Sequence, residues 1–245
     1  MNLMEHIRYL AKEIGPRGST TENEKAAADY IVKELEKTGF KPEVENFKSA
    51  VSGWYPYALF AFMMLLGETL YLFKLPAAAA AISFIALISV ITELLFRSNL
   101  LRILLPKADS RNVVLKVNPS GKVKDKVILV SHMDSHRTPL AFSSPGWVKL
   151  FDVLVPTGLA SAFIMAVLYV LSIFIAWQYW TLLTLPFALI QAAIFILTMQ
   201  TDFTPYTEGA NDNASGVAVC LEIAGMLKKE PLSGTEVWLV FSGCE

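Results

Sequence analysis

The stretch EGANDNASG, residues 208–216, decides how the rest of the chain is interpreted. It is polar and contains two acids, yet it follows a segment, 153–201, with no Asp, Glu, Lys or Arg. One interpretation is local: Asp212 or Asn213 caps the helical pattern that follows, because such side chains satisfy free N–H groups at a helix start. The other is chemical: Asp212 is a carboxylate at a metal site. Taken alone, the stretch favours the helix cap.

Composition divides the chain into two kinds of segment. The 245 residues are 54% hydrophobic and only 18% charged, whereas soluble domains have about 25% charged residues. The shortage of charge is concentrated in two blocks, 49–96 and 153–201. The net charge of −1 gives no sign of a nucleic-acid-binding surface. Two cysteines are too few for a disulfide framework and indicate a reducing compartment.

Each apolar block contains two stretches close to the roughly 20 residues that are needed to cross a bilayer. We therefore predict two transmembrane hairpins, 54–96 and 153–200, with spans at 54–73, 76–96, 153–176 and 180–199. Aromatic residues lie where interfacial aromatics are usual, namely Trp54, Tyr55, Tyr57, Trp177, Tyr179 and Trp180. The alternative, buried core helices, would need a core larger than the polar remainder can cover.

The orientation of the hairpins follows from the distribution of basic residues. Both hairpins return the chain to the side that it left, so all polar segments share one compartment. Lys and Arg are frequent on that side, whereas the turns on the other side contain only Lys74. The positive-inside rule therefore predicts a multi-pass protein of the cell membrane with a cytoplasmic polar domain. Glu68 and Glu93 lie near span ends, where solvation at the interface is favoured over a transport role.

The polar segments have the pattern of an α/β domain. TENE, residues 21–24, is a capping box at a helix start, and 112–117, 126–131 and 235–241 have the pattern of strands. We expect a mixed, largely parallel sheet flanked by helices, interrupted by the two transmembrane hairpins. The domain is predicted to consist of three parts, at 1–50, 109–150 and 203–245.

Three polar clusters adjoin these elements: SHMDSH (131–136), GANDNASG (209–216) and SGCE (242–245). Sites in open α/β sheets form beyond the carboxyl ends of strands, so His132 and Glu245 are expected at one edge, with Asp212 folded against it. Imidazole and carboxylate are normal zinc ligands, and a carboxylate can bridge two ions. Asp134 can orient the imidazole of His132 through its other nitrogen.

Each of these residues also has a structural interpretation. His132 is explained equally well as a hydrogen-bonded loop residue and as a metal ligand. Glu245 alone gives no indication of a function. His136 is favoured as a loop residue, and His6 as a structural residue on an amphipathic surface helix. Cys244 offers no strong case for a nucleophile paired with a base. The combination of clusters, rather than any one of them, predicts the metal site.

The same residues resemble zinc metallopeptidase family 28, which includes leucine aminopeptidases, aminopeptidase Y, glutamate carboxypeptidases and glutaminyl cyclases. HMDS follows a strand, GANDNASG opens a helix, and a strand ends in SGCE. The resemblance implies that His132 binds one zinc ion, that Asp212 bridges two, and that Asp134 supports His132. It also implies that Glu245 is the general base and that the peptide bond between Asp212 and Asn213 is cis.

Family members continue with a metal-binding Glu directly after the base, then an Asp and a His. This chain ends at Glu245, so the resemblance predicts a truncated chain that alone holds zinc poorly and is inactive. In soluble relatives a short loop joins the motifs at His132 and Asp212, whereas here a predicted hairpin intervenes. Long insertions in surface loops are tolerated because closure entropy grows slowly with length. We expect the insertion to keep the site near the bilayer, which would favour short or membrane-delivered peptides.

The resulting hypothesis is a membrane-anchored, two-zinc aminopeptidase whose partners are a peptide substrate and the lipid bilayer. Carboxypeptidase or cyclase chemistry stays open, and so do the substrate side chain and the oligomeric state. The alternative is a catalytically inactive relative that serves as a membrane scaffold or chaperone component. A transporter is disfavoured because the predicted spans contain few polar groups.

Overall fold

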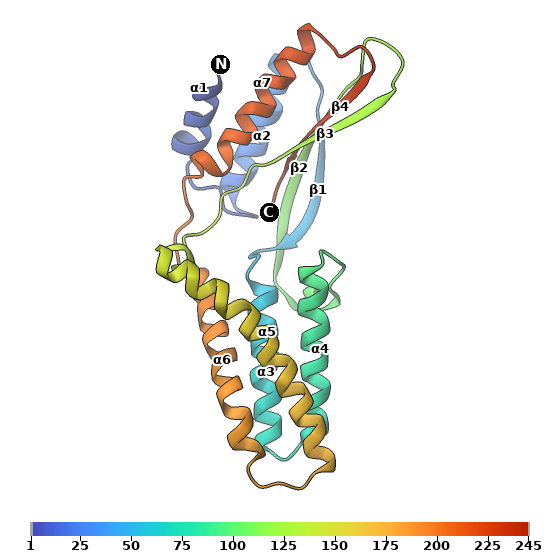
Figure 1. Cartoon of the computed structure of the whole chain (residues 1–245). Coiled ribbons are helices and arrows are strands. Elements are labelled where there is room, and N and C mark those ends of the chain that lie inside the picture. The colour runs from blue at the N-terminus through green and yellow to red at the C-terminus, as the bar shows by residue number, and fades with distance from the viewer. Residues whose placement is uncertain (1, 245) are drawn as a thin grey trace. The chain divides into compact units, whose positions relative to one another are not determined.

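The computed structural model describes residues 2–244, and contacts group them into two units (Figure 1). The α/β unit comprises the chain up to Val51, Pro106–Arg137 and the chain from Pro205 onward. The helical unit comprises Ser52–Leu105 and Thr138–Thr204. Residues 138–150, assigned above to the α/β part, lie in the helical unit instead. There a short 3-10 turn, η3 (Leu140–Phe142), leads directly into a long helix.

The α/β unit is built on a four-stranded sheet with the order β1-β2-β4-β3. Its strands are β1 (Glu43–Ala50), β2 (Lys107–Val117), β3 (Asp125–His132) and β4 (Thr235–Ser242). The predicted mixed α/β fold is confirmed. The expectation of a largely parallel sheet is wrong for the described strands, because β1–β2 and β2–β4 are antiparallel and β3–β4 alone is parallel.

The connections explain this pairing. The first insertion returns the chain beside the point that it left, so Ala50 pairs with Lys107 as the ends of a hairpin do. Parallel neighbours need a crossover connection. Among the described strands, such a connection joins β3 to β4 through helix α7 (Ser215–Lys229).

Helices cover one face of this sheet. Helices α1 (Leu3–Arg8), α2 (Glu22–Lys37) and α7 share one hydrophobic core with the strands, and Figure 1 shows them on one side of the sheet. Side chains alternate along a strand, so Leu239 and Phe241 are buried in this core while Trp238 points to the other face. On that other face and along the edge strand β3, apolar side chains such as Ile128 and Val130 are exposed.

The helical unit contains four long helices in which every member packs against two others. They are α3 (Tyr55–Leu72), α4 (Pro76–Leu94), α5 (Pro145–Phe174) and α6 (Trp180–Thr201). Both α3 and α5 contact α4 and α6. Small residues line the contacts and allow close approach, including Ala61, Ala79, Ala86, Ala162 and Ala166. All four helices are long and apolar enough to cross a membrane, by length and composition.

Two acids of the helical unit, Glu68 and Glu93, bind other protein groups, and Glu68 is buried rather than solvated as expected. Glu68 is buried, and its carboxylate accepts hydrogen bonds from the hydroxyls of Tyr169 (2.7 Å) and Thr184 (2.9 Å). These partners come from α5 and α6, so one carboxylate links three helices. Glu93 contacts Arg102 and accepts a hydrogen bond from the amide of Asn99 at 3.0 Å.

Candidate metal centre

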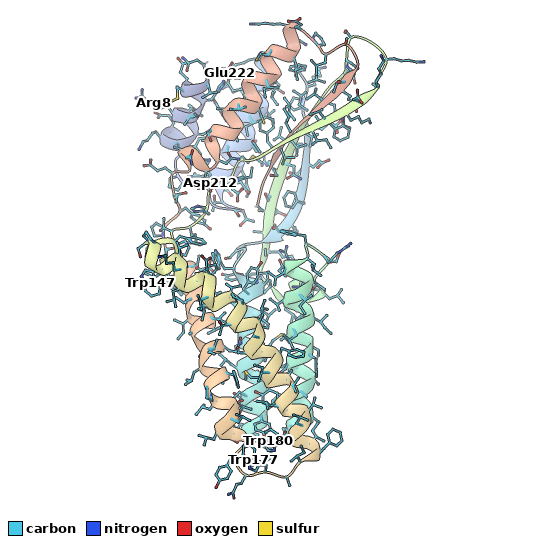
Figure 2. All side chains as sticks on the ribbon, viewed as in Figure 1. Arg8, Trp147, Trp177, Trp180, Asp212 and Glu222 are labelled. Carbon is cyan, nitrogen blue, oxygen red and sulfur yellow. The ribbon has the colours of Figure 1, made fainter. Side chains whose placement is uncertain are left out.

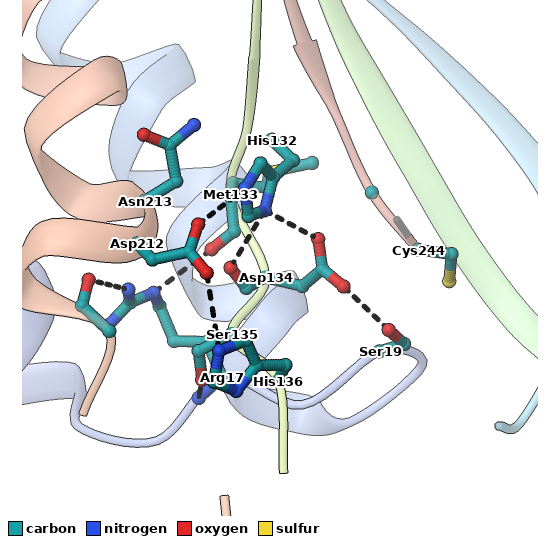
Figure 3. A network of polar contacts seen from close by, with 12 residues as sticks. Arg17, Ser19, His132, Met133, Asp134, Ser135, His136, Asp212, Asn213 and Cys244 are labelled. Carbon is teal, nitrogen blue, oxygen red and sulfur yellow. Dashed lines mark hydrogen bonds and ion pairs between the residues drawn. The ribbon is translucent and has the colours of Figure 1, made fainter. Parts of the chain in front are cut away.

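Polar side chains gather where β3 ends and α7 begins, within the α/β unit (Figure 3). His132, the last residue of β3, places its Nε2 3.0 Å from Oδ1 of Asp212, which lies 80 residues further along the chain. The other carboxylate oxygen of Asp212 is 3.3 Å from Nε2 of His136. The structure therefore brings together His132 and Asp212, and it adds the imidazole of His136, for which the sequence favours a loop role.

The parallel pairing of β3 with β4 explains why this edge collects the predicted residues. His132 is the register partner of Ser242, and the backbone N–H of Met133 donates to the carbonyl of Ser242 at 2.9 Å. The carboxyl ends of both strands therefore lie at one edge of the sheet. Glu245 follows Ser242 by three positions but lies outside the described residues, so its predicted role as the base stays a prediction.

Asp134 is buried beside the imidazole of His132. Its Oδ1 is 3.4 Å from Nδ1 of His132, and its Oδ2 accepts a hydrogen bond from the hydroxyl of Ser19 at 2.6 Å. Nδ1 of His132 is also 3.2 Å from the backbone oxygen of Asp134. A proton on Nδ1 would leave the Nε2 lone pair directed toward Asp212. This is the arrangement that supports a metal-bound imidazole.

The local structure shows that Asp212 is not the residue that caps helix α7. Asp212 and Asn213 have non-helical backbone angles, and the peptide bond between them is cis, as the resemblance implied. At the start of α7, Oδ1 of Asn213 accepts the backbone N–H of Gly216 at 3.1 Å. Asn213 thus satisfies a free N–H of the helix, and the carboxylate of Asp212 faces the two imidazoles instead.

Two buried charged residues lie beside the site. The sequence gives no sign of a role for Arg17, yet its guanidinium is fully buried and binds backbone carbonyls. Burial lowers its pKa, and the negative charge of Asp134 opposes that shift. No periodic pattern marks such a residue, since its partners belong to distant loops.

Glu24 is the second buried charge, and it corrects the predicted capping box. Thr21 caps helix α2 as expected, but the carboxylate of Glu24 accepts the N–H groups of Thr20 and Cys244, each at 2.9 Å. Burial raises the pKa of Glu24. Glu24 therefore holds the segment that follows β4, rather than the backbone of Thr21.

The remaining candidates have structural surroundings. His6 is buried rather than on the surface, and its Nδ1 is 2.6 Å from the hydroxyl oxygen of Tyr30. Burial raises the pKa of the Cys244 thiol to about 11, which argues against a reactive nucleophile.

The chemistry of the donor set fits zinc in part. An imidazole nitrogen and a carboxylate oxygen are normal zinc ligands, so His132 and Asp212 could supply two of them. Within residues 2–244, however, no group of three or more His, Cys, Asp or Glu side chains is arranged to hold an ion. The described residues thus provide an incomplete ligand set.

Comparison with known proteins locates a family match in the C-terminal part of the chain. No curated protein matches the chain. Similar solved structures include a glutaminyl cyclase of Tannerella forsythia, at 14% identity and a TM-score of 0.47, which aligns over 98% of this chain and 45% of that one. A leucine aminopeptidase precursor of Bacteroides thetaiotaomicron has 13% identity and a TM-score of 0.46, over 98% and 45%. A Zn-dependent exopeptidase of Parabacteroides distasonis has 16% identity and a TM-score of 0.43, over 98% and 46%.

The chain spans less than half the length of these solved structures. Residues 193–245, which carry both GANDNASG and SGCE, match peptidase family M28. The resemblance predicted from the sequence is therefore confirmed for residues 193–245, the segment that matches peptidase family M28.

Proposed function

We propose that this chain belongs to a membrane-anchored, zinc-dependent aminopeptidase with two co-catalytic ions. The observation that carries the proposal is the convergence of His132 and Asp212 at the sheet edge, with a second imidazole facing the other oxygen of Asp212. His132 would bind one ion and Asp212 would bridge both. Bound zinc would polarise the substrate carbonyl and lower the pKa of a water molecule.

The residues of the chain would position and move protons around that centre. Asp134 would keep the imidazole of His132 in one tautomer and orientation through Nδ1. Glu245 would accept the proton of the attacking water and deliver it to the leaving amine. The peptide substrate would be short or delivered at the membrane surface, because the second insertion leaves the chain between the two ligand-bearing segments.

The helical unit supports the membrane part of the proposal. Large apolar side chains remain exposed along its helices, among them Phe84, Ile88, Phe163, Leu182 and Ile196. Soluble proteins rarely expose so many apolar side chains together, whereas a bilayer would cover them. Figure 2 places Trp177 and Trp180 at the turn between α5 and α6, and such aromatics favour the interface. We propose a multi-pass protein of the cell membrane with its α/β unit in the cytoplasm.

The catalytic proposal is tested with the natural protein in detergent. Its substrates are peptides that become fluorescent when the amide bond after the first residue is cleaved. Activity should disappear with a chelator and return with zinc. Asp212→Asn should lower kcat/KM by about 100- to 1,000-fold or more, because it removes the bridging carboxylate. The matched control is Asp109→Asn, an exposed acid paired with Lys48 in the same unit, which should leave kcat/KM unchanged.

The products separate the related chemistries. An aminopeptidase frees the N-terminal residue, a carboxypeptidase frees the C-terminal one, and a cyclase releases ammonia from N-terminal glutamine. Full activity in Asp212→Asn would contradict the assignment of Asp212. A protein that neither binds zinc nor acts on any of these substrates would support the scaffold alternative.

The orientation is tested by single cysteines at two exposed sites in a background lacking Cys220 and Cys244. Lys74→Cys lies in the turn between α3 and α4, and Ser120→Cys lies in the turn after β2. In intact cells a membrane-impermeant maleimide should label residue 74 and should reach residue 120 only after permeabilisation. The reverse labelling would overturn the proposed orientation.

A further inference from the structure

A buried cation lies between the two loops that carry the predicted ligands. Arg17 has no exposed surface, and its guanidinium donates hydrogen bonds to five backbone carbonyl oxygens. The acceptors are the carbonyls of Leu10 (2.6 Å), Gly15 (2.9 Å), Met133 (3.0 Å), Glu208 (2.9 Å) and Gly209 (2.9 Å). All five acceptors are neutral, so this is a framework of backbone contacts rather than an ion pair.

The acceptors are placed next to the predicted ligands in the chain. Met133 lies between His132 and Asp134, so its carbonyl belongs to the loop that carries both side chains. Glu208 and Gly209 come shortly before Asp212. One side chain therefore contacts the backbone of both loops that carry the predicted ligands.

Backbone contacts of Arg17 reinforce the same connection. The N–H of Arg17 donates to Oγ of Ser135 at 3.0 Å, and the carbonyl of Arg17 accepts the N–H of Ser135 at 2.9 Å. The hydroxyl of Ser135 donates in turn to the carbonyl of Thr207 at 2.8 Å. Gly209 has a φ of 60°, and a Cβ there would lie 2.7 Å from Nη2 of Arg17. The second loop thus approaches the guanidinium too closely for a side chain.

This role requires arginine rather than any cation. A guanidinium presents five N–H donors in a planar fork, whereas a lysine ammonium presents three donors at one point. A lysine at position 17 could keep the charge but could not reach carbonyls on both loops at once. Arg17 contacts no group that would react, so its effect would pass through the backbone to His132 and Asp212.

We propose that Arg17 is a positioning residue of the metal centre, which sets the distance between His132 and Asp212 by holding residues 133–135 and 207–209 together. This inference rests on the proposed function for its consequence in catalysis. The geometry of the loops, by contrast, can be tested without metal or substrate.

The test is Arg17→Lys in the natural protein, with Arg111→Lys as the matched control. Arg111 is a partly exposed arginine of the same unit that pairs with Asp29. Competition with a zinc-binding dye should show zinc affinity weakened about 10- to 100-fold for Arg17→Lys, the range for residues that orient metal ligands. The control should be unchanged. In turnover, kcat should fall while KM stays nearly constant.

Hydrogen–deuterium exchange on the metal-free protein gives a second readout. Arg17→Lys should accelerate exchange at 133–136 and 207–213 and leave the core of α7 and β4 unchanged. Ser135→Ala, which removes one link of the same framework, should give a smaller change in the same segments. This second variant keeps the inference testable if Arg17→Lys fails to fold.

The outcomes are distinct. Unchanged zinc affinity and unchanged exchange in a folded Arg17→Lys protein would overturn the inference. Uniformly faster exchange across the α/β unit, with zinc affinity reduced only by the unfolded fraction, would reduce Arg17 to a stabilising residue and also overturn it. A wild-type protein that binds no zinc would refute the proposed function, while the exchange pattern would still decide whether Arg17 holds the two loops.

Discussion

The two units use buried polar groups in different ways. In the α/β unit, Arg17 and Glu24 bind the backbone of loops. In the helical unit, Glu68 binds hydroxyls of neighbouring helices, and the amide of Gln191 donates to Oγ of Ser161 at 2.6 Å. Loops lack internal backbone partners, whereas helices satisfy nearly all of their own backbone groups. A buried charge is therefore needed to shape the loops, and a polar side chain in the bundle mainly links one helix to another.

Removing the buried side chain from each unit gives the largest expected difference. Arg17→Met removes the side-chain donor of five carbonyls, two of which, those of Leu10 and Gly209, still accept a backbone N–H. The change should lower the stability of the α/β unit by about 4 kcal/mol or more, since each unmatched buried group costs about 1–3 kcal/mol. Glu68→Leu should cost only about 1–2 kcal/mol, because the hydroxyl of Thr184 already lies 3.2 Å from the carbonyl of Thr181. Protease protection of each unit during thermal unfolding in detergent would measure both. Equal losses of stability in the two variants would contradict the proposed difference between the two units.

Glycine substitutions test the same contrast through packing. Gly209→Ala places a methyl group at a φ of 60° against Arg17 and the carbonyl of Asp212, and should cost about 2–3 kcal/mol. Gly158→Ala in α5 meets the Cδ1 end of Ile194, which can rotate away. Alanine also favours a helix, so this change should cost less than about 1 kcal/mol. Thermal unfolding of both variants measures these losses of stability. A larger loss for Gly158→Ala than for Gly209→Ala would contradict the expected difference between the two units.

The reactivity of the Cys244 thiol tests whether the segment that Glu24 holds is packed as described. Because burial raises the pKa of Cys244 from 9.0 to about 11, the thiolate at pH 8 should be about 100-fold scarcer than for an ordinary thiol. Alkylation by iodoacetamide, followed by mass spectrometry, should be slow for Cys244 in the native protein and fast after denaturation. Equal rates in the two states would mean that residue 244 is not held in this packed position.

The smallest expected effect is the pH dependence contributed by Glu24. Burial raises its pKa above the usual 4.5, so the folded protein binds the proton more tightly than the unfolded chain does. Its contribution to stability is therefore complete at low pH and is lost as pH rises through the window from about 4.5 to the raised pKa. Glu24→Gln should remove this slope, so its stability relative to wild type should rise with pH. Denaturant unfolding at several pH values checks the sign.

Local patterns determined much of this protein. Uninterrupted apolar runs predict α3 to α6 because a helix long enough to cross a bilayer needs no distant partner for its backbone. The polar clusters that follow β3 and precede α7 predicted the meeting of His132 and Asp212, because strand ends collect at sheet edges. The stretch GANDNASG, on which the predicted resemblance rests, lies inside the segment that matches peptidase family M28.

Tertiary structure decided what those patterns leave open. The direction of strand pairing depends on where the first insertion returns the chain, so β1–β2 became antiparallel. The burial of Glu68 depends on which residues of α5 and α6 face it. Arg17 binds backbone carbonyls of loops that lie more than a hundred residues further along the chain. Carbonyls are present at every residue and leave no mark in a sequence, so only the folded chain selects which of them a buried arginine binds.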